Sequence, residues 1–427
     1  MIVKFREGQP AQRNRIPMIV DAKGGSVVVF LVCVELFRGI AGHSSPPSST
    51  SPSPLSNSVR NDGKVSAFYV LGDSSVDCGE NTLFYPFLHK NLSLHPCSGS
   101  DSSLIPHFLA EKMGLGNSPP FYGQNSSVDY VLKGLNFGSA EATIMNFGDR
   151  KFQSLNQQIR QALETFQLVQ LHLTEEDTRE FMESSVTYLS FGKDDYVELF
   201  LRNSSSASTP KFTAQEFSGI LVNQMTTAVM KLYHANVRKI VCMGILPLGC
   251  APRIVWERRN WTSSEGRERG KTCVQEINEL IVQYNTKMQD RAAKLNRELI
   301  DVKIVFCDVY QGIMEIIANP VKHGMEDIRG ACCGAGWNGA LVGCLARAMA
   351  CRRESAHVWW DLYNPTREVN RLLADSAWSG HRNGLSKIDS ICHPVSIQKL
   401  VSTSTSASSS SEGGTYNVAR QDRSLQP

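Results

Sequence analysis

Short apolar runs alternate with helical segments through most of the chain, and this alternation limits the fold more than any other feature. Five runs have the near-continuous hydrophobicity of strands buried on both faces: Val65–Leu71, Leu135–Phe137, Val186–Phe191, Lys239–Ile245 and Lys303–Cys307. Apolar residues at helical spacing occupy Ser102–Met113, Gln153–Leu173, Ala214–Ala235, Val274–Leu299 and Thr366–Ser376. Because strands that alternate with helices build a parallel sheet covered on both faces, we expect an α/β fold.

Polar and small residues directly follow these predicted strands. Ser74 ends the sequence Gly72-Asp73-Ser74, and comparable groups lie at 138–141, 193–195 and 247–250. The carboxyl ends of parallel strands meet at one edge of a sheet, and ligands bind there in folds of this class. We therefore expect one shared site. A serine that a buried strand delivers to a tight turn is well placed to act as a nucleophile in it.

Six sequence blocks occur in a fixed order around these positions. They are Gly72-Asp73-Ser74, Asn136-Phe137-Gly138-Ser139-Ala140, Phe191-Gly192-Lys193-Asp194-Asp195, Gly244-Ile245-Leu246-Pro247-Leu248-Gly249-Cys250, Ala331-Cys332-Cys333-Gly334 and Trp360-Asp361-Leu362-Tyr363-Asn364-Pro365-Thr366. From about residue 66 to 378 the chain thus closely resembles the plant GDSL esterase/lipase family of SGNH-type serine hydrolases. The resemblance implies a three-layer α/β/α sandwich, flavodoxin-like, with a mainly parallel five-stranded sheet. It also implies hydrolysis of carboxylic esters, such as acyl lipids or acylated cell-wall polymers.

The family's site residues fall on five positions of this chain. Ser74 matches the nucleophile, whose own N–H is an oxyanion donor, and Asp361 matches the acid that orients the base. Asn364 stands where the family has its histidine base. The two other oxyanion donors of the family, a glycine and an asparagine, fall on Glu141 and Asp194. Two positions therefore match the family pattern and three depart from it.

The three departures oppose the reaction that the resemblance implies. A serine hydroxyl needs a base to take its proton, and the amide of Asn364 is not basic. Carboxylates at Glu141 and Asp194 repel the negative charge that develops on the oxyanion. Three functions stay open from the sequence. The first is an ester hydrolase with impaired catalysis, and the second is a non-catalytic extracellular protein that binds an ester, lipid or glycan in the retained cleft. The third is a carbohydrate- or lipid-modifying acyltransferase, which no residue specifically indicates.

Other residues offer alternative chemistry at this site. A buried Glu141 or Asp194 with a raised pKa can act as a weak base. Histidines that can replace the missing base are His107, His323, His357, His381 and His393. Four carboxylates that can hold a divalent cation if they converge are those of Asp73, Glu141, Asp194 and Asp361. Our prediction is a site with no metal and no cofactor.

The chain ends predict a secreted protein. Residues 1–42 form a signal peptide region, because the apolar run Ser26–Val34 follows Lys23 and is too short to span a membrane. The translation start is Met1 or Met18. We expect a disordered Ser/Pro linker at 43–63, the hydrolase-like domain at 64–395, and a disordered Ser-rich tail at 396–427.

Cysteines and glycosylation sequons support the same compartment. Twelve cysteines favour an oxidising environment, and at least two disulfides are expected from Cys250, Cys273 and the cluster Cys332, Cys333, Cys344 and Cys351. Zinc is the competing interpretation of that cluster. Cys78 and Cys97 form another candidate pair, and loss of Cys33 with the signal peptide leaves an odd thiol. Sequons occur at Asn91, Asn125, Asn203 and Asn260.

The formal net charge of +3, without a dense basic stripe, argues against nucleic-acid binding. A small-molecule or polymer ester is the expected partner, with no membrane span. The sequence gives no indication of the oligomeric state, the acyl chain or the alcohol.

Overall fold

A computed structural model of the chain describes residues 65–77, 104–123, 128–145, 153–201, 212–261, 272–344, 347–379 and 388–403. All of them belong to one compact unit, Asn57–Pro427. The predicted signal peptide region and linker lie outside the described residues, as do Asn91, Asn125, Asn203, His381 and the pair Cys78 and Cys97. The backbone of Asn260 is part of a helix, Pro252–Trp261.

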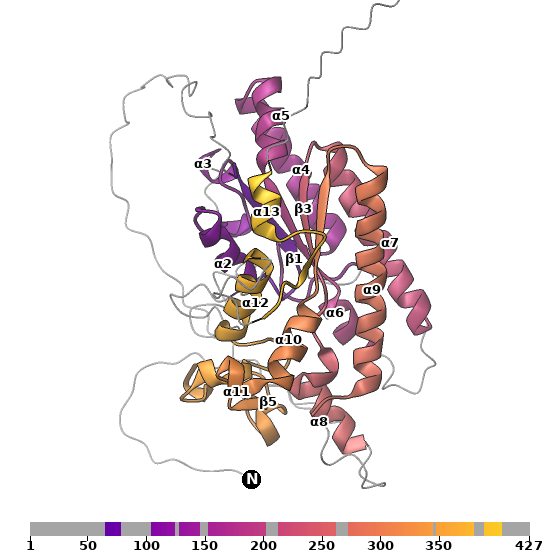
Figure 1. Ribbon diagram of the computed structural model, residues 1–427, viewed down its shortest axis with the longest axis vertical. Coiled ribbons are helices and arrows are strands. Elements are labelled where there is room, and N and C mark those ends of the chain that lie inside the picture. The colour runs from indigo at the N-terminus through magenta and orange to yellow at the C-terminus, as the bar shows by residue number, and fades with distance from the viewer. Residues whose placement is uncertain are drawn as a thin grey trace, which may run out of the picture. The chain divides into compact units, whose positions relative to one another are not determined.

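The centre of the unit is a five-stranded sheet (Figure 1). Its order is β1 (Phe68–Gly72), β2 (Val186–Ser190), β3 (Lys239–Met243), β4 (Lys303–Cys307) and β7 (Cys392–His393). The first four strands are parallel and in register, so that their carboxyl ends reach one edge together, and β7 pairs antiparallel with β4. The prediction of a mainly parallel five-stranded sheet is confirmed.

One of the predicted strands is wrong. Leu135–Phe137 forms isolated bridges instead: Asn136 pairs with Val70 of β1 and with Pro120. The run is short and Gly134, with φ of 106°, turns the chain just before it, so that no ladder develops. The fifth strand is β7, whose two residues are too few to give a sequence pattern.

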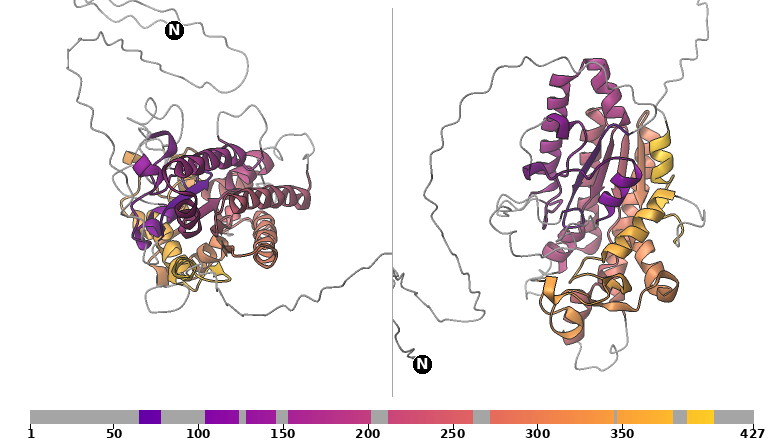
Figure 2. Two further views of the ribbon diagram at one scale, coloured as in Figure 1. Left: turned by 90° about the horizontal axis from the view of Figure 1, so that it is seen from above. Right: turned by 90° about the vertical axis from the view of Figure 1, so that its left-hand side faces the viewer.

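Helices cover both faces of the sheet, as the side view in Figure 2 shows. One face carries α4 (Leu155–His172), α7 (Ala214–His234) and α9 (Gln275–Glu298), which contact one another and the strands. The other carries α2 (Ile105–Lys112), α10 (Val309–Ala318), α12 (Arg367–Ser379) and α13 (Ile397–Ser402). Shorter or peripheral helices are α3 (Val128–Val131), α5 (Glu175–Ser184), α6 (Lys193–Asp195), α8 (Pro252–Trp261) and α11 (Pro320–His323).

The five predicted helices are all present, within a few residues of their expected ends. Helix α9 buries the stripe Ile277, Ile281, Tyr284 and Met288 against the sheet, which is the reason its charged remainder still forms a stable helix. Among the described residues, no helix is both long and apolar enough to cross a membrane.

The folded unit continues beyond the predicted boundary at 395. Helix α13 begins after Ser396, whose side chain accepts a hydrogen bond from the Lys399 N–H. It packs on β3 and β4 through Ile397 and Leu400, both buried. The prediction of disorder from 396 is therefore wrong as far as residue 403, because two apolar residues in a Ser-rich segment suffice to anchor one short helix.

Four disulfides fasten the described part of the chain: Cys250–Cys273, Cys307–Cys392, Cys332–Cys351 and Cys333–Cys344. The prediction of at least two disulfides from these cysteines is met. The whole 332–351 cluster forms disulfides, which leaves no thiolate there for zinc. Cys242 of β3 is a free, buried thiol.

Candidate functional site

The first loop of the site follows β1 and carries Ser74. The Asp73 N–H donates to the Ser190 carbonyl of β2 at 2.9 Å, which turns the chain at the sheet edge and leaves Ser74 partly exposed. Glycine is needed at position 72, since a Cβ there would lie 2.5 Å from the same Ser190 oxygen. The sequence Gly72-Asp73-Ser74 thus puts a serine at the carboxyl edge of the sheet.

The second loop follows β2 and carries three buried charged side chains. Gly192 has φ of 109°, a left-handed conformation that glycine adopts freely, and the one-turn helix α6 follows at once. Lys193, Asp194 and Asp195 are at most 6% exposed. Lys193 and Asp194 lie on the side of the Ser74 loop, whereas Asp195 contacts the segment at Ile144 and Met145.

The third loop follows β6 (His357–Trp359), which pairs in a small second sheet with β5 (Asp327–Ala331). Asp361 Oδ1 accepts the N–H groups of Tyr363 at 2.9 Å and Asn364 at 2.8 Å. This tight turn brings the Asn364 side chain back over the Asp361 carboxylate. Both residues are buried.

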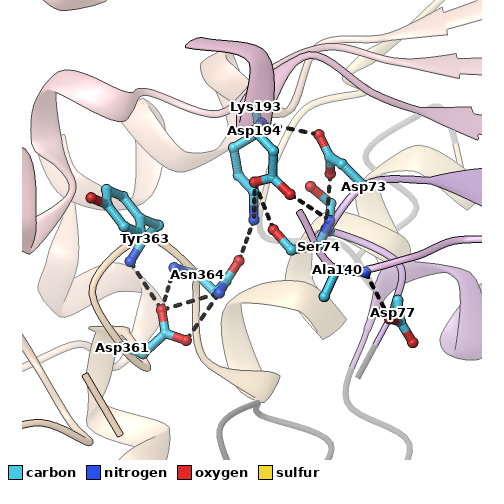
Figure 3. Close-up of polar contacts among 10 residues, drawn as sticks. Asp73, Ser74, Asp77, Ala140, Lys193, Asp194, Asp361, Tyr363 and Asn364 are labelled. Atoms are coloured by element: carbon cyan, nitrogen blue, oxygen red, sulfur yellow. Dashed lines mark hydrogen bonds and ion pairs between the residues drawn. The ribbon is translucent and has the colours of Figure 1, made fainter. Parts of the chain in front are cut away.

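Five side chains from these loops form one continuous row of polar contacts, which we call the Ser74–Asp361 line (Figure 3). Asn364 Nδ2 donates to both Asp361 carboxylate oxygens, at 2.9 and 3.1 Å. Lys193 Nζ donates to Asn364 Oδ1 at 2.5 Å and lies 3.9 Å from Asp194 Oδ1. The Ser74 hydroxyl donates to the same Asp194 oxygen at 2.7 Å. Four of the five predicted site residues are therefore brought together.

Asp194 binds Ser74 through two groups at once. Its Oδ1 accepts the Ser74 hydroxyl and its Oδ2 accepts the Ser74 N–H at 3.0 Å. In an acyl-transfer site that hydroxyl proton goes to a base, and that N–H points at the oxyanion. The Asp194 carboxylate thus accepts the serine proton's hydrogen bond and also takes up the N–H that would otherwise face the oxyanion.

Glu141 lies outside the line. It follows Ala140, whose N–H donates to Asp77 Oδ2 at 2.7 Å, and its side chain is exposed. Its backbone has φ of 59°, in the left-handed region that favours glycine. The position that the resemblance assigns to a glycine thus keeps a glycine conformation, with a glutamate in it.

Burial raises the pKa values of two aspartates in this region. Asp73 has its pKa raised to about 6, first by desolvation and then by repulsion from Asp194, which Lys193 partly offsets. Asp195 has its pKa raised to about 7 by desolvation, although its two backbone hydrogen bonds act in the opposite direction. Both groups therefore titrate far closer to neutrality than an exposed aspartate does.

Asp195 belongs to a set of buried polar side chains that hold the strand-end loops by their backbones. The set, which we call the loop frame, pairs Gln158 with Gly72, Asp195 with Ile144 and Met145, Asn285 with Ile245, and Asn278 with Gly249. Each of these bonds is 2.8–3.1 Å long. Because the frame bonds to the backbone, it holds the loops after β1 and β3 and the segment at Ile144 and Met145 without using side chains of the line.

The histidines considered as replacement bases make other contacts. His357 Nδ1 bonds the Arg353 carbonyl at 3.0 Å and lies 3.5 Å from Cys351 Sγ. His107 caps the start of α2, and burial lowers its pKa to about 4. His323 is buried beside α10, 3.5 Å from Glu315, and His393 is exposed on β7. The contacts described for these four rings do not include Ser74.

The four carboxylates considered for a divalent cation do not surround a common point. Asp73 and Asp194 are neighbours, since the Asp194 N–H donates to Asp73 Oδ2 at 3.4 Å. Asp361 is separated from them by Asn364 and Lys193. The Lys193 ammonium group thus takes the place beside these carboxylates that a bound cation would need.

A cavity adjoins the line on the side of α10 and α12. It is small, with a cavity volume of about 40 Å³. Lys193, Asn364 and Asp73 are among its polar lining residues. Its other walls are mostly apolar and include Met243, Ile245, Val309, Ile313 and Leu373. Such a small cavity, mostly apolar with a few polar groups in its wall, fits a short apolar group of a ligand that also carries a polar group.

The sequence placed residues 193–195 at the shared site but assigned no role to Lys193, and it did not reveal the loop frame. Asn278 and Asn285 gave a weak signal for the frame, as polar residues on the apolar side of α9.

Comparison with known proteins agrees with this architecture. The family profile described as GDSL-like Lipase/Acylhydrolase matches residues 68–377. GDSL esterase/lipase At1g71250 of Arabidopsis thaliana is 28% identical over 355 residues, which cover 80% of this chain and 90% of that protein. GDSL esterase/lipase At1g71691 of the same plant is 27% identical over 394 residues, covering 87% and 95%. The resemblance found in the sequence blocks is confirmed: the chain belongs to the GDSL-like lipase/acylhydrolase family.

Proposed function

We propose that this protein recognises carboxylic esters with apolar acyl groups outside the cell, and hydrolyses them far more slowly than a family member with an intact triad. Family membership supports esters as the ligand class, and acyl lipids or acylated cell-wall polymers fit it. The cavity beside Lys193 and Asn364 supports an apolar acyl group. Ser74 remains the nucleophile in whatever hydrolysis occurs.

The observation that carries this proposal is the state of Ser74. Its hydroxyl and its N–H both donate to the Asp194 carboxylate, and the side chain at the base position is the amide of Asn364. An ester carbonyl that approached Ser74 would compete with a carboxylate for the same N–H. When the base of a dissected triad is removed, activity falls by roughly a thousandfold or more.

Hydrolysis and binding are measured separately in the test. We expect slow labelling of the wild type by a fluorophosphonate probe, and slow release of nitrophenol from p-nitrophenyl butyrate. Saturable quenching of tryptophan fluorescence by the same ester, followed with Ser74→Ala, reports binding alone. Ile313→Phe fills the cavity and should weaken that binding, whereas Ile316→Phe, buried on the same helix but outside the cavity wall, serves as the matched control.

A second function, efficient hydrolysis with Asp194 as the base, is favoured by the 2.7 Å bond from the Ser74 hydroxyl to Asp194 Oδ1. In that case the wild type turns over esters rapidly, and both Ser74→Ala and Asp194→Asn abolish the turnover. This result would refute slow hydrolysis as the property of the site. Absence of saturable ester binding would refute recognition.

The extracellular location rests on the leader, the sequons and the disulfides. We propose that a signal peptide within residues 1–42 is removed and that some of the four sequons carry glycans. Four disulfides in the described part of the chain support an oxidising compartment. Amino-terminal sequencing of the protein from plant tissue, with a glycosidase shift on a gel, tests both points. An unprocessed, unglycosylated protein in the cytosol would contradict them.

A further inference from the structure

Lys193 is a buried cation in the middle of the site. Its side chain is 3% exposed, and an ammonium group taken out of water is stable only with close polar or charged partners. Asn364 Oδ1 is its hydrogen-bond partner, and the Asp194 carboxylate is within ion-pair distance. It also offsets the rise in the pKa of Asp73.

The contacts of Lys193 fix the orientation of the Asn364 amide. Lysine can only donate hydrogen bonds and an ionised carboxylate can only accept them. The amide oxygen must therefore face Lys193 and the amide nitrogen must face Asp361, as the distances have it. No other orientation of Asn364 satisfies both neighbours.

From this geometry we infer that Lys193 is a positioning residue that locks the line in its unreactive arrangement, an inference that rests on the slow hydrolysis proposed above. Asn364 reaches Lys193, and Lys193 reaches the Asp194 carboxylate that holds Ser74. The ammonium group thus stands between the base position and the nucleophile. Lys193 and Asn364 act as a matched pair, and replacing Asn364 alone does not free Ser74.

The consequence concerns a histidine introduced at position 364. One ring nitrogen would bond Asp361, and the other would meet the Lys193 ammonium, which donates to it. A ring nitrogen whose lone pair already accepts a hydrogen bond from the lysine is not free to take the Ser74 proton. When Lys193 is replaced by a residue without the ammonium group, the same ring nitrogen is free to face the serine.

The reaction to be measured is phosphonylation of Ser74 by a fluorophosphonate. The Ser74 oxygen bonds to phosphorus, fluoride leaves, and the serine proton passes to the imidazole. We compare Asn364→His with Lys193→Met/Asn364→His. Since a positioned general base contributes about 10²-fold or more, we expect the double variant to react about a hundredfold faster than the single one. Its rate should rise with pH through the ordinary imidazole pKa of about 6.5.

Two further variants keep the test decisive. Lys239→Met/Asn364→His removes another buried lysine, at the amino end of β3, and should react no faster than Asn364→His. If Lys193→Met fails to fold, Lys193→Leu is the second variant, because it also has no hydrogen-bond donor to offer the ring nitrogen. Folding of every variant is checked by thermal unfolding.

The outcomes are separable from those of the proposed function. A folded Lys193 double variant that reacts no faster than Asn364→His, or without the imidazole pH dependence, overturns the lock. An Asn364→His single variant that reacts as fast as the double variant also overturns the lock. Ester binding by the wild type is a separate measurement, so a failed lock with intact binding leaves the proposed function standing.

Discussion

The loop frame and the Ser74–Asp361 line lie side by side at the carboxyl edge of the sheet, yet they differ in what their chemistry achieves. Each frame side chain bonds to backbone groups of a loop, as Asn285 does with both the N–H and the carbonyl of Ile245. The line bonds mostly side chain to side chain, and Lys193, Asp194 and Asn364 within it oppose acyl transfer. The contrast is clearest in two adjacent residues: Asp195 holds a loop, and Asp194 holds the nucleophile.

This difference teaches how a site can change while its fold persists. Because the frame holds the loops after β1 and β3 by their backbones, exchanging the side chains of Lys193 and Asn364 leaves those hydrogen bonds in place. The line can therefore exchange a base for an amide and gain a buried lysine, provided that the new side chains satisfy one another. Lys193, Asn364 and Asp361 do so in one unbroken row.

The largest expected effect is on the line. Replacing Lys193 by Met, Asn364 by His, Asp194 by Asn and Glu141 by Gly together restores a base, frees the Ser74 N–H and removes two carboxylates. We expect kcat/KM for p-nitrophenyl esters to rise about a thousandfold over the wild type, or about 4 kcal/mol of transition-state stabilisation. The rate is measured with Ser74→Ala in the same background as the control for reaction at other groups.

The order of these replacements sharpens the result. Asp194→Asn and Glu141→Gly alone should gain little, because no base is present to use the freed oxyanion donors. A large gain from these two alone would show that Asn364 and Lys193 do not limit the reaction, and the line would no longer act as a unit.

The next effect is on the frame. Asn285→Ala removes both hydrogen bonds to Ile245 and leaves buried backbone groups without these partners. We expect the free energy of unfolding to fall by about 3 kcal/mol, since each lost buried bond costs about 1–3 kcal/mol. Urea denaturation measures it, with Asn319→Ala at the exposed end of α10 as control. A loss below that of the control would mean that the frame does not hold the loops.

The sequence revealed the fold better than it revealed the site. Apolar runs that are buried on both faces and helices with one apolar stripe carry periodic patterns, so four strands and five helices were predictable. Leu135–Phe137 failed because a run of three residues can bridge without forming a ladder, and β7 was missed for a similar reason. A helix as short as α13 likewise leaves little pattern.

The site was predictable as positions, not as contacts. Matching the blocks located Ser74, Asp194, Asp361 and Asn364, because those residues keep their spacing from the strand ends. What Lys193 touches depends on the distance between two loops 171 residues apart, which no local pattern encodes. That the Asp194 carboxylate bonds the Ser74 N–H was likewise visible only in three dimensions.

A third effect separates the frame from Asp73, the residue beside Ser74, by pH. Native Asp73 has its pKa raised to about 6, whereas in the unfolded chain it titrates near 3.8. The native state therefore keeps a proton that the unfolded state has released, so this contribution is fully present below about pH 4 and is lost as pH rises through 6. The expected loss is on the order of 2–3 kcal/mol. Asp195, with its pKa raised to about 7, acts in the same direction.

Urea titrations at several pH values between 4 and 8 measure this slope. Asp73→Asn should flatten it, and Glu164→Gln, on the exposed face of α4, should leave it unchanged. A slope that persists in Asp73→Asn but vanishes in Asp195→Asn would assign the titration to the frame alone. Stability that instead rises between pH 4 and 7 would contradict the raised pKa values of both groups.

The smallest effect concerns Glu141, which belongs to neither set of contacts. Its φ of 59° places a side chain in a backbone region that costs a non-glycine residue about 1–2 kcal/mol. Glycine adopts this region freely but loses more entropy on folding, by about 0.5–1 kcal/mol. We therefore expect Glu141→Gly to stabilise the protein by no more than about 1 kcal/mol, measured by urea denaturation at neutral pH. Glu141→Ala is the matched comparison, because it removes the carboxylate but keeps the Cβ. If alanine stabilises as much as glycine, the charge and not the backbone is the cause. If glycine alone stabilises, the turn still has the conformation of the family's glycine, and this position differs from the rest of the site in side chain only.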